Sequence, residues 1–191
     1  MSISPAARDE VVVLIDDSIA NVNLRRHMLA TEAVMRGLAA RLGEDPDLWG
    51  LTGLAHDLDA EETEGDETRH GARAAERLAE LGLPADLTHA VMAHNPATAA
   101  VVERPIDVAL IAADQTTGLI TAATLVRPDR SLPLVKVSSV RKRMREGAFA
   151  RGVHRESILR CDELGLDLAE FLTIALTAMQ GVATELGLAG E

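Results

Sequence analysis

The chain has 191 residues, a length that suits one ordinary domain with a sizeable apolar core. Its formal net charge of -11 argues against binding a long nucleic acid, because most of the surface would repel the phosphate backbone. A small phosphorylated ligand would need a local basic patch. Cys161 is the only cysteine, which excludes an intrachain disulfide and a thiolate-rich metal site, so any metal would be held by histidines and carboxylates.

The composition favours helices over sheets. Ala and Leu dominate, aromatic residues make up only 2% of the chain, and runs of β-branched residues are short. We therefore expect an all-α fold, a compact helical bundle that forms a single domain over residues 1–191. The apolar run at residues 11–15 is too short for a membrane span or a signal-peptide core, so we expect a soluble, cytoplasmic protein without a membrane partner.

Helical periodicity, broken at Gly and Pro, predicts three helices in the first part of the chain, over about residues 9–20, 22–42 and 46–58. The second helix places His27 beside a buried apolar stripe and ends at Gly43, a residue that suits a C-cap. In the third helix, Asp45 is the expected N-cap and Pro46 lies in the first turn, where its missing N–H does no harm.

The acidic stretch after the third helix, residues 59–66, predicts an exposed loop. Two helices are expected next, over about residues 68–81 and 84–94. His70 would head the apolar stripe of the first of them, and His94 would end the apolar face of the second. His89 points about 140 degrees away from His94, so we expect that these two histidines do not share a site.

A long apolar helix is predicted from about residue 106, and it carries Asp114 in a setting where a carboxylate requires a partner. Pro128 and Pro133 then bracket a connection to a basic segment, which would form one helix or two short ones. Its cations are candidates for a clamp on a substrate phosphate, or else form a solvated helix face that balances nearby acids. They are Lys136, Arg141, Lys142, Arg143 and Arg145.

The end of the chain predicts one more helix. Asp167 is the expected N-cap, and Glu170 stands three residues later, as in a capping box. The apolar face of this helix continues to Leu186, and Gly187 is the expected stop.

Several histidines lie on or beside predicted buried faces, namely His27, His56, His70 and His94. A lone histidine of this kind is usually a hydrogen-bonded core residue. Four of them in one domain, together with Asp57 and Asp114, favour a metal site instead. His89 and His154 are less constrained, and we expect them to lie outside that site.

The adjacent pair His56-Asp57 is the most informative position. Successive residues on a helix diverge by about 100 degrees, so the imidazole and the carboxylate can approach one metal from different directions. The second carboxylate oxygen is then free to reach a neighbouring metal. Gly50 and Gly53 on the same helix leave room for another backbone to come close.

This pattern resembles the HD superfamily of metal-dependent phosphohydrolases, whose motif is a histidine, then His-Asp, then a distal aspartate. The matching residues are His27, His56-Asp57 and Asp114, and the resemblance covers about residues 21–117. It extends to small bacterial members of the two-metal type, which carry two more histidines where this chain has His70 and His94. The resemblance implies an all-helical fold, with residues 118–191 as a helical extension, and six ligands that hold two metals bridged by Asp57. Some relatives hold one metal with the four core ligands alone.

The resemblance also implies a reaction, the hydrolysis of a small phosphate mono- or diester such as a nucleotide. Two divalent ions about 3.5 to 4 Å apart would acidify a bridging water, present hydroxide to phosphorus and neutralise the phosphoryl oxygens. Iron or manganese is expected, with Ni, Co, Zn or Mg as alternatives. Catalysis would depend most on Asp57. One departure is that many two-metal relatives have a glycine and a lysine shortly after the pair, whereas this chain reads HDLDAEE, so that lysine's phosphate contact is missing.

The roles of four charged residues near these motifs stay open. Arg25 and Arg26, just before His27, are either phosphate contacts or solvated side chains. Asp59 and Glu61 are either simple loop carboxylates or acid-base helpers beside the metal site.

Two other functions fit the same residues. A few members of the superfamily use the same six ligands to hold a mixed-valent di-iron centre and act as oxygenases. A non-catalytic nucleotide-binding protein could also keep the fold, although a site that has lost its activity tends to lose some of its ligands.

Overall fold

The computed structural model describes residues 5–190, and this part of the chain is built from helices, which confirms the all-α prediction. The α-helices are α1 (Pro5–Ser18), α2 (Val22–Leu42), α3 (Pro46–Ala55), α4 (Ala72–Glu80), α5 (Ala85–Ala93), α6 (Pro105–Leu125), α7 (Val137–Met144), α8 (Arg155–Leu159) and α9 (Leu168–Gly181). Short 3-10 helices occupy Pro96–Thr98, Leu132–Leu134 and Arg160–Leu164. Within residues 5–190 the β-pairing is limited to one isolated bridge between Ser131 and Ala189.

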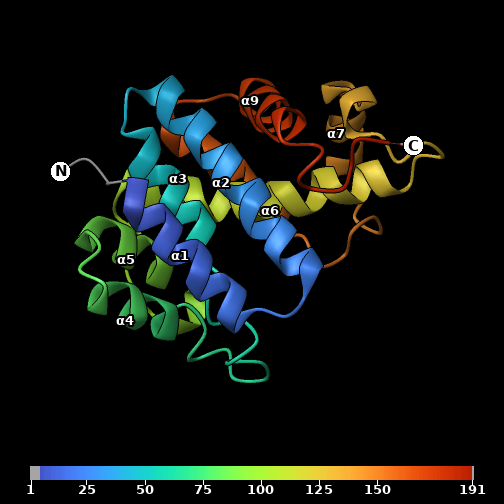
Figure 1. The fold of residues 1–191 in the computed structure, drawn as a ribbon. Coiled ribbons are helices and arrows are strands. Elements are labelled where there is room, and N and C mark those ends of the chain that lie inside the picture. The colour runs from blue at the N-terminus through green and yellow to red at the C-terminus, as the bar shows by residue number, and fades with distance from the viewer. Residues whose placement is uncertain (1–4, 191) are drawn as a thin grey trace.

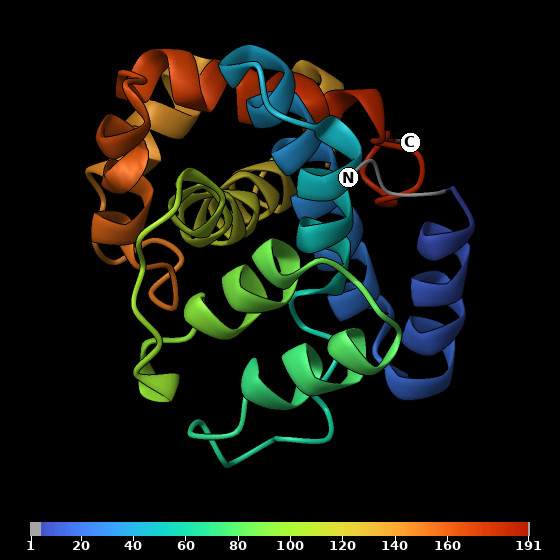
Figure 2. The ribbon, with the colours of Figure 1, turned by 90° about the vertical axis from the view of Figure 1, so that its left-hand side faces the viewer.

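The helix α6 lies near the centre of the molecule (Figures 1 and 2). It packs against α2, α5, α7, α8 and α9, so helices from both halves of the sequence cover it. Figure 2 shows α9 above it and α4 and α5 below it. By length and composition α6 could cross a membrane, but 61% of its most apolar window is buried inside the protein, as in the core helix of a soluble protein.

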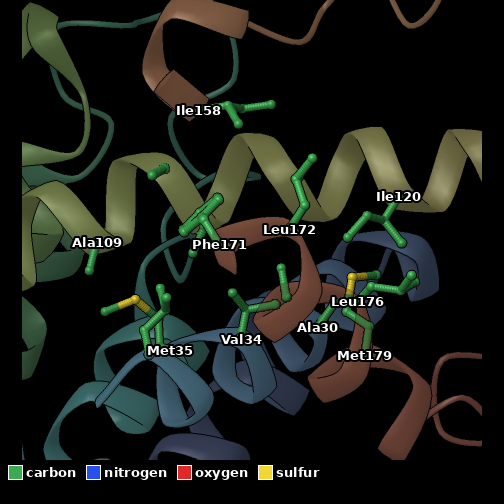
Figure 3. Packing of buried hydrophobic residues seen from close by; sticks show 14 of the residues in the cluster. Ala30, Val34, Met35, Ala109, Ile120, Ile158, Phe171, Leu172, Leu176 and Met179 are labelled. Carbon is green, nitrogen blue, oxygen red and sulfur yellow. The ribbon is translucent and has the colours of Figure 1, made fainter. Parts of the chain in front are cut away.

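Two clusters of buried apolar residues hold the helices together. The larger one joins α2, α6 and α9, where Val34, Ile120 and Phe171 are completely buried (Figure 3). The smaller one joins α1, α3, α4 and α5, and Leu54 and Leu87 belong to it. The segment that follows α3, with the pair His56-Asp57, therefore lies between two packed halves that fix its position.

Local capping signals set the ends of α2 and the start of α3, as predicted. The Asn21 side chain accepts hydrogen bonds from the first backbone N–H groups of α2, and Gly43 ends the helix in a left-handed conformation with φ 78°. Asp45 caps α3 in the same way, because its carboxylate accepts from the N–H groups of Asp47 and Leu48. These ends depend on neighbours in sequence, and the sequence therefore predicts them well.

The predicted ends were wrong where distant groups decide them. The helix α3 ends at Ala55 and not at residue 58, so His56 is its C-cap and Asp57 lies in the following turn. His70 does not head a helical stripe, because α4 begins only at Ala72.

The last helix also differs from the prediction. Its N-cap is Asp167, as expected, but the Glu170 side chain pairs with Arg41 of α2. The helix ends at Gly181, and the chain then turns so that the carbonyl of Leu188 accepts a hydrogen bond from the N–H of Leu132. Pairing with a distant segment thus replaces the predicted last turns of the helix.

We expect the variant Phe171→Ala to lose about 3–5 kcal/mol of unfolding free energy, because it leaves a cavity in the larger cluster. Phe149→Ala is the matched control, since Phe149 is only partly buried at the edge of that cluster. Denaturant unfolding followed by circular dichroism measures both variants. Equal losses in the two would contradict the assignment of Phe171 to the centre of the core.

Candidate metal centre

His27 and Asp114 come from the two long helices and meet at one side of the site. His27 lies on α2 and Asp114 on α6, and the His27 Nε2 atom is 3.0 Å from Asp114 Oδ1. His56, at the end of α3, brings its Nε2 atom to 3.2 Å from His27 Nε2. Three different helices thus place two imidazoles and a carboxylate within reach of one metal ion.

Asp57 lies at the centre of the site and faces two groups of histidines. Its Oδ2 atom is 3.6 Å from His27 Nε2 and 3.3 Å from His56 Nε2. Its Oδ1 atom is 3.4 Å from His70 Nε2 and 3.6 Å from His94 Nε2. Two groups that could each hold a metal therefore share this carboxylate, namely His27–His56–Asp57 and Asp57–His70–His94. We call them the first and the second triad.

Backbone carbonyls decide which nitrogen of His56 and His94 is available. The Nδ1 atom of His56 lies 2.9 Å from the carbonyl oxygen of Gly53, and Nδ1 of His94 is paired with the carbonyl oxygen of Val91. A carbonyl oxygen only accepts, so Nδ1 must carry the proton in each ring. The Nε2 atom of each neutral ring then presents a lone pair to the site.

Side-chain oxygens do the same for the other two histidines. The Thr117 hydroxyl donates to the carbonyl oxygen of Asp114 at 2.7 Å, so its oxygen accepts from Nδ1 of His27 at 3.1 Å. Nδ1 of His70 donates to the Asp59 carboxylate at 2.9 Å. All four neutral rings therefore direct an Nε2 lone pair toward Asp57.

This arrangement fits a bound cation. His27 and His56 hold their Nε2 atoms 3.2 Å apart, and so do His70 and His94. Two lone pairs at that distance repel each other unless a positive charge lies between them. Ligands about 2.1 Å from a metal in octahedral geometry are separated by about 3 Å, so the spacing of the donors matches metal ligation.

Asp59 orients His70 from a buried position. Its carboxylate is fully buried and accepts hydrogen bonds from His70 Nδ1 and from the N–H groups of Gly71 and Ala74, at 2.8 to 2.9 Å. These bonds also cap the start of α4. The acid-base role considered for Asp59 is therefore wrong, because its oxygens face His70 and the backbone. Partners of metal-binding histidines of this kind fix the tautomer and strengthen the ligand.

Glu61 has no place in the site either. Its carboxylate accepts hydrogen bonds from the backbone N–H groups of Ala20 and Asn21, at 2.9 and 2.7 Å. It therefore ties the loop to the turn between α1 and α2, and the acid-base role considered for it is wrong.

Gly53 permits the close approach of α2 and α3 that brings His27 to His56. A Cβ atom on Gly53 would lie 2.7 Å from the Thr31 carbonyl oxygen of α2, closer than real contacts allow. A Cβ atom on Gly50 would meet the Arg36 side chain at 2.6 Å. The room that these glycines were expected to leave is therefore occupied by the neighbouring helix.

Charge attraction shifts the pKa values within the site. Burial disfavours the charged form of His56, but the negative charge of Asp57 and its hydrogen bond outweigh burial and raise the pKa of His56. The hydrogen bond to Asp59 raises the pKa of His70. Burial acts to raise the pKa of Asp57, yet the charge of His56 prevails and holds it well below its usual range. Without a metal, protons on the histidines compensate the carboxylates.

The family comparison agrees with this geometry. The HD domain family model matches residues 24–118, which include Asp57 and the five candidate ligands around it. This chain belongs to the HD-domain superfamily. The match nearly coincides with the predicted range of 21–117. Searches of curated proteins and of solved structures gave no match.

A cavity of about 510 Å³ opens in front of the two triads. Its lining residues are Asp57, Glu67, His70, His94, Asn95, Pro96, Ile111, Asp114, Gln115, His154, Glu156 and Ser157. Three of them come from residues 154–157, beyond the matched region. Gln115 connects the two parts, because it donates to Asp114 Oδ2 at 2.8 Å and accepts from the His154 N–H at 2.8 Å.

His154 belongs to neither triad, as expected, but it forms part of the cavity wall, which the sequence did not predict. Its sequence context gave no signal, because a turn after α7 brings it there. His89, by contrast, faces away as predicted, and its Nδ1 atom lies 3.3 Å from the buried Asp107 carboxylate.

The predicted phosphate clamp does not cover this cavity. Among the described residues, the cavity lining includes no member of the basic segment. Arg143 pairs with Glu146 and lies 4.4 Å above the Phe149 ring, while Arg141, Lys142 and Arg145 line a separate depression on α7. Lys136 lies at the exposed start of the same helix. The path of the chain after α6 takes this helix against α9, and the solvated-face interpretation replaces the clamp.

The two arginines before His27 have different surroundings. Arg25 donates to the carbonyl oxygen of Ile19 and to Asp16, so it fixes the turn between α1 and α2. Arg26 lines a second cavity, on the other side of His27.

The pKa shifts predict how stability depends on pH in chelator-treated protein. His56 and His70 have raised pKa values, so their contribution is complete below about 6.5, the unfolded value, and is lost as the pH rises through the higher folded value. We expect the melting temperature to fall across that interval. Added Mn²⁺ should reverse the trend, because metals bind the deprotonated rings. A melting temperature that rises with pH in the chelated protein would contradict the assignment.

The variant Asp59→Asn tests the role of Asp59. We expect Mn²⁺ affinity at the second triad to fall by about 10–100-fold, because the amide no longer fixes His70 as a carboxylate does. Glu61→Gln is the matched control, since it removes the same charge from the same loop without touching a histidine. Titration calorimetry measures both variants, and a variant Asp59→Asn that binds as tightly as the control would contradict this role.

Proposed function

We propose that this HD-domain protein is a metal-dependent phosphohydrolase that hydrolyses a small phosphate mono- or diester, such as a nucleotide. The observation that supports it most is the position of Asp57, whose two oxygens face two pairs of imidazole lone pairs. A site with four such nitrogens and two carboxylates suits Fe or Mn, with Ni, Co, Zn and Mg as alternatives. We infer two ions, one for each triad.

Two divalent ions held there would supply an acidified water and would neutralise negative charge on the phosphoryl group. The residues of the chain provide the geometry. Asp57 serves both triads, and Gln115 holds one oxygen of Asp114 so that the other oxygen faces His27. The ring of His154 and the hydroxyl of Ser157 have no hydrogen-bond partner among the described residues, so they are available to the ester.

The lining of the cavity favours a substrate whose negative charge is neutralised by metal ions at the two triads. Among the described lining residues there is no lysine or arginine. In this proposal the phosphoryl charge is therefore neutralised at the metal cluster, and the walls position the rest of the ester by polar contacts. We also propose a cytoplasmic location. The single cysteine, Cys161, is buried and has no partner for a disulfide, which is typical of proteins in a reducing compartment.

The variant Asp57→Ala tests the proposal. With protein loaded with Mn²⁺ or Fe²⁺, we expect turnover of 4-nitrophenyl phosphate, its bis diester or a nucleotide to fall by at least about 100-fold, because both triads lose their shared ligand. Glu64→Ala is the matched control, since Glu64 is an exposed carboxylate of the following loop.

Three outcomes would contradict the proposal. The first is that loaded wild-type protein turns over none of these esters. The second is that Asp57→Ala retains full activity. The third is iron-dependent oxygen consumption without hydrolysis, measured with an oxygen electrode, which would favour the oxygenase.

A further inference from the structure

A second cavity, of about 520 Å³, lies between α2, α6 and the end of the chain. Its lining residues are Asn23, Arg26, His27, Ala30, Gly118, Thr121, Ala122, Leu125, Arg130, Leu186, Gly187 and Leu188. His27 therefore lines this cavity while its Nε2 atom faces the metal centre. In Figure 1 the red C-terminal segment runs beside the far end of α6, where this cavity is found.

The cavity is positive at its rim and apolar inside. Arg26 and Arg130 are exposed, and neither forms an ion pair with a described residue, while no carboxylate is present among the described lining residues. The floor is formed by buried apolar side chains, among them Leu186 and Leu188. In a chain with a net charge of -11, two unpaired arginines beside an apolar floor complement a ligand that is both apolar and anionic.

The two cavities follow one face of α6. Ile111, Asp114 and Gln115 line the first cavity, and Gly118, Ala122 and Leu125 line the second. Residues at these spacings lie in one row along a helix, and the row continues past the metal centre.

Gly118 is the residue of this row in the second cavity that lies nearest the first cavity. A Cβ atom on Gly118 would meet only the Val153 side chain, at an ordinary 3.5 Å. Packing therefore does not require glycine at this position, although glycine weakens a helix interior. Val153 packs beside it, so the contact between the two sites lies at His27, which lines the second cavity and faces the metal centre.

The backbone places Arg130 in an unusual conformation. Its φ is 46°, in the left-handed region that favours glycine or asparagine, and its N–H donates to the carbonyl oxygen of Arg127 at 3.2 Å. The turn itself therefore does not call for an arginine. The position of Arg26 depends on a glycine. Its guanidinium packs against Gly187, where a Cβ atom would lie 2.6 Å from it.

We propose that this second cavity takes the organic part of the substrate, and that this part has an apolar body and a second negative charge that Arg26 and Arg130 bind. The phosphate ester itself would lie at the metal centre. The two sites adjoin at His27, which lines this cavity while its Nε2 atom faces the metal centre, so a substrate with two separated anionic groups can contact both. This inference rests on the proposed function, whose substrate class it specifies.

The test compares 1-naphthyl phosphate with the same ester carrying a sulfonate on the far ring. We expect Arg26→Gln and Arg130→Gly each to lower the ratio of kcat/KM, sulfonated over plain ester, by about tenfold, because each removes one charged contact to the second anion. Arg41→Gln is the matched control, since it removes the same charge from the other end of α2. Arg130→Gly should leave the melting temperature unchanged or higher, because glycine suits a positive φ.

A second readout does not depend on turnover. In chelator-treated protein we expect the fluorescent dye 8-anilinonaphthalene-1-sulfonate to bind, and both arginine variants to weaken this binding by a similar factor relative to Arg41→Gln. Turnover of both esters with an unchanged ratio would overturn the inference and leave the proposed function standing. If no ester is turned over, the proposed function fails, and the dye alone decides whether the cavity is an anion site. Dye binding that the arginine variants do not change would overturn it.

Discussion

The arrangement of lone pairs around Asp57 is the constraint on which the rest of the site depends. Each imidazole has its Nδ1 proton fixed by an acceptor on a different element, such as the Gly53 carbonyl for His56 and the Asp59 carboxylate for His70. The rings therefore cannot turn to relieve the repulsion between their Nε2 atoms without losing those bonds. The fold thus holds a set of donors that is unfavourable by itself and favourable around a cation, which is the preorganisation that a metal site requires.

That arrangement depends in turn on the packing on either side. Asp57 follows α3, which belongs to the smaller apolar cluster, while Asp114 lies on α6, which the larger cluster surrounds. Gly53 lets α2 and α3 approach closely enough for His27 and His56 to meet. Burial by itself disfavours the negative charge of Asp57, but positive charges on surrounding histidines from three helices outweigh it. The lowered pKa of Asp57 reflects this balance.

The sequence predicts this protein well where local rules decide and poorly where distant contacts decide. The ends of α2 follow from Asn21 and Gly43, and helical spacing was enough to place His27 on its inner face. The position of His70 before α4 could not be predicted, because the carboxylate that caps this helix comes from Asp59, across a loop. The prediction of a phosphate clamp failed for the same reason. It required α7 to reach the metal centre, and the path of the chain after α6 determines where this helix packs.

The division of the chain between motif and extension follows the same physical logic. The family match ends at residue 118, and the described ligand atoms of the two triads all lie within it. Later residues complete the cavity walls, with His154 at one cavity and Arg130 and Leu188 at the other. Metal chemistry needs a fixed set of donors, whereas recognition needs surfaces that differ between substrates. A chain that keeps the donors and builds part of the recognition surface from its extension can therefore change its substrate without disturbing Asp57 and the histidines around it.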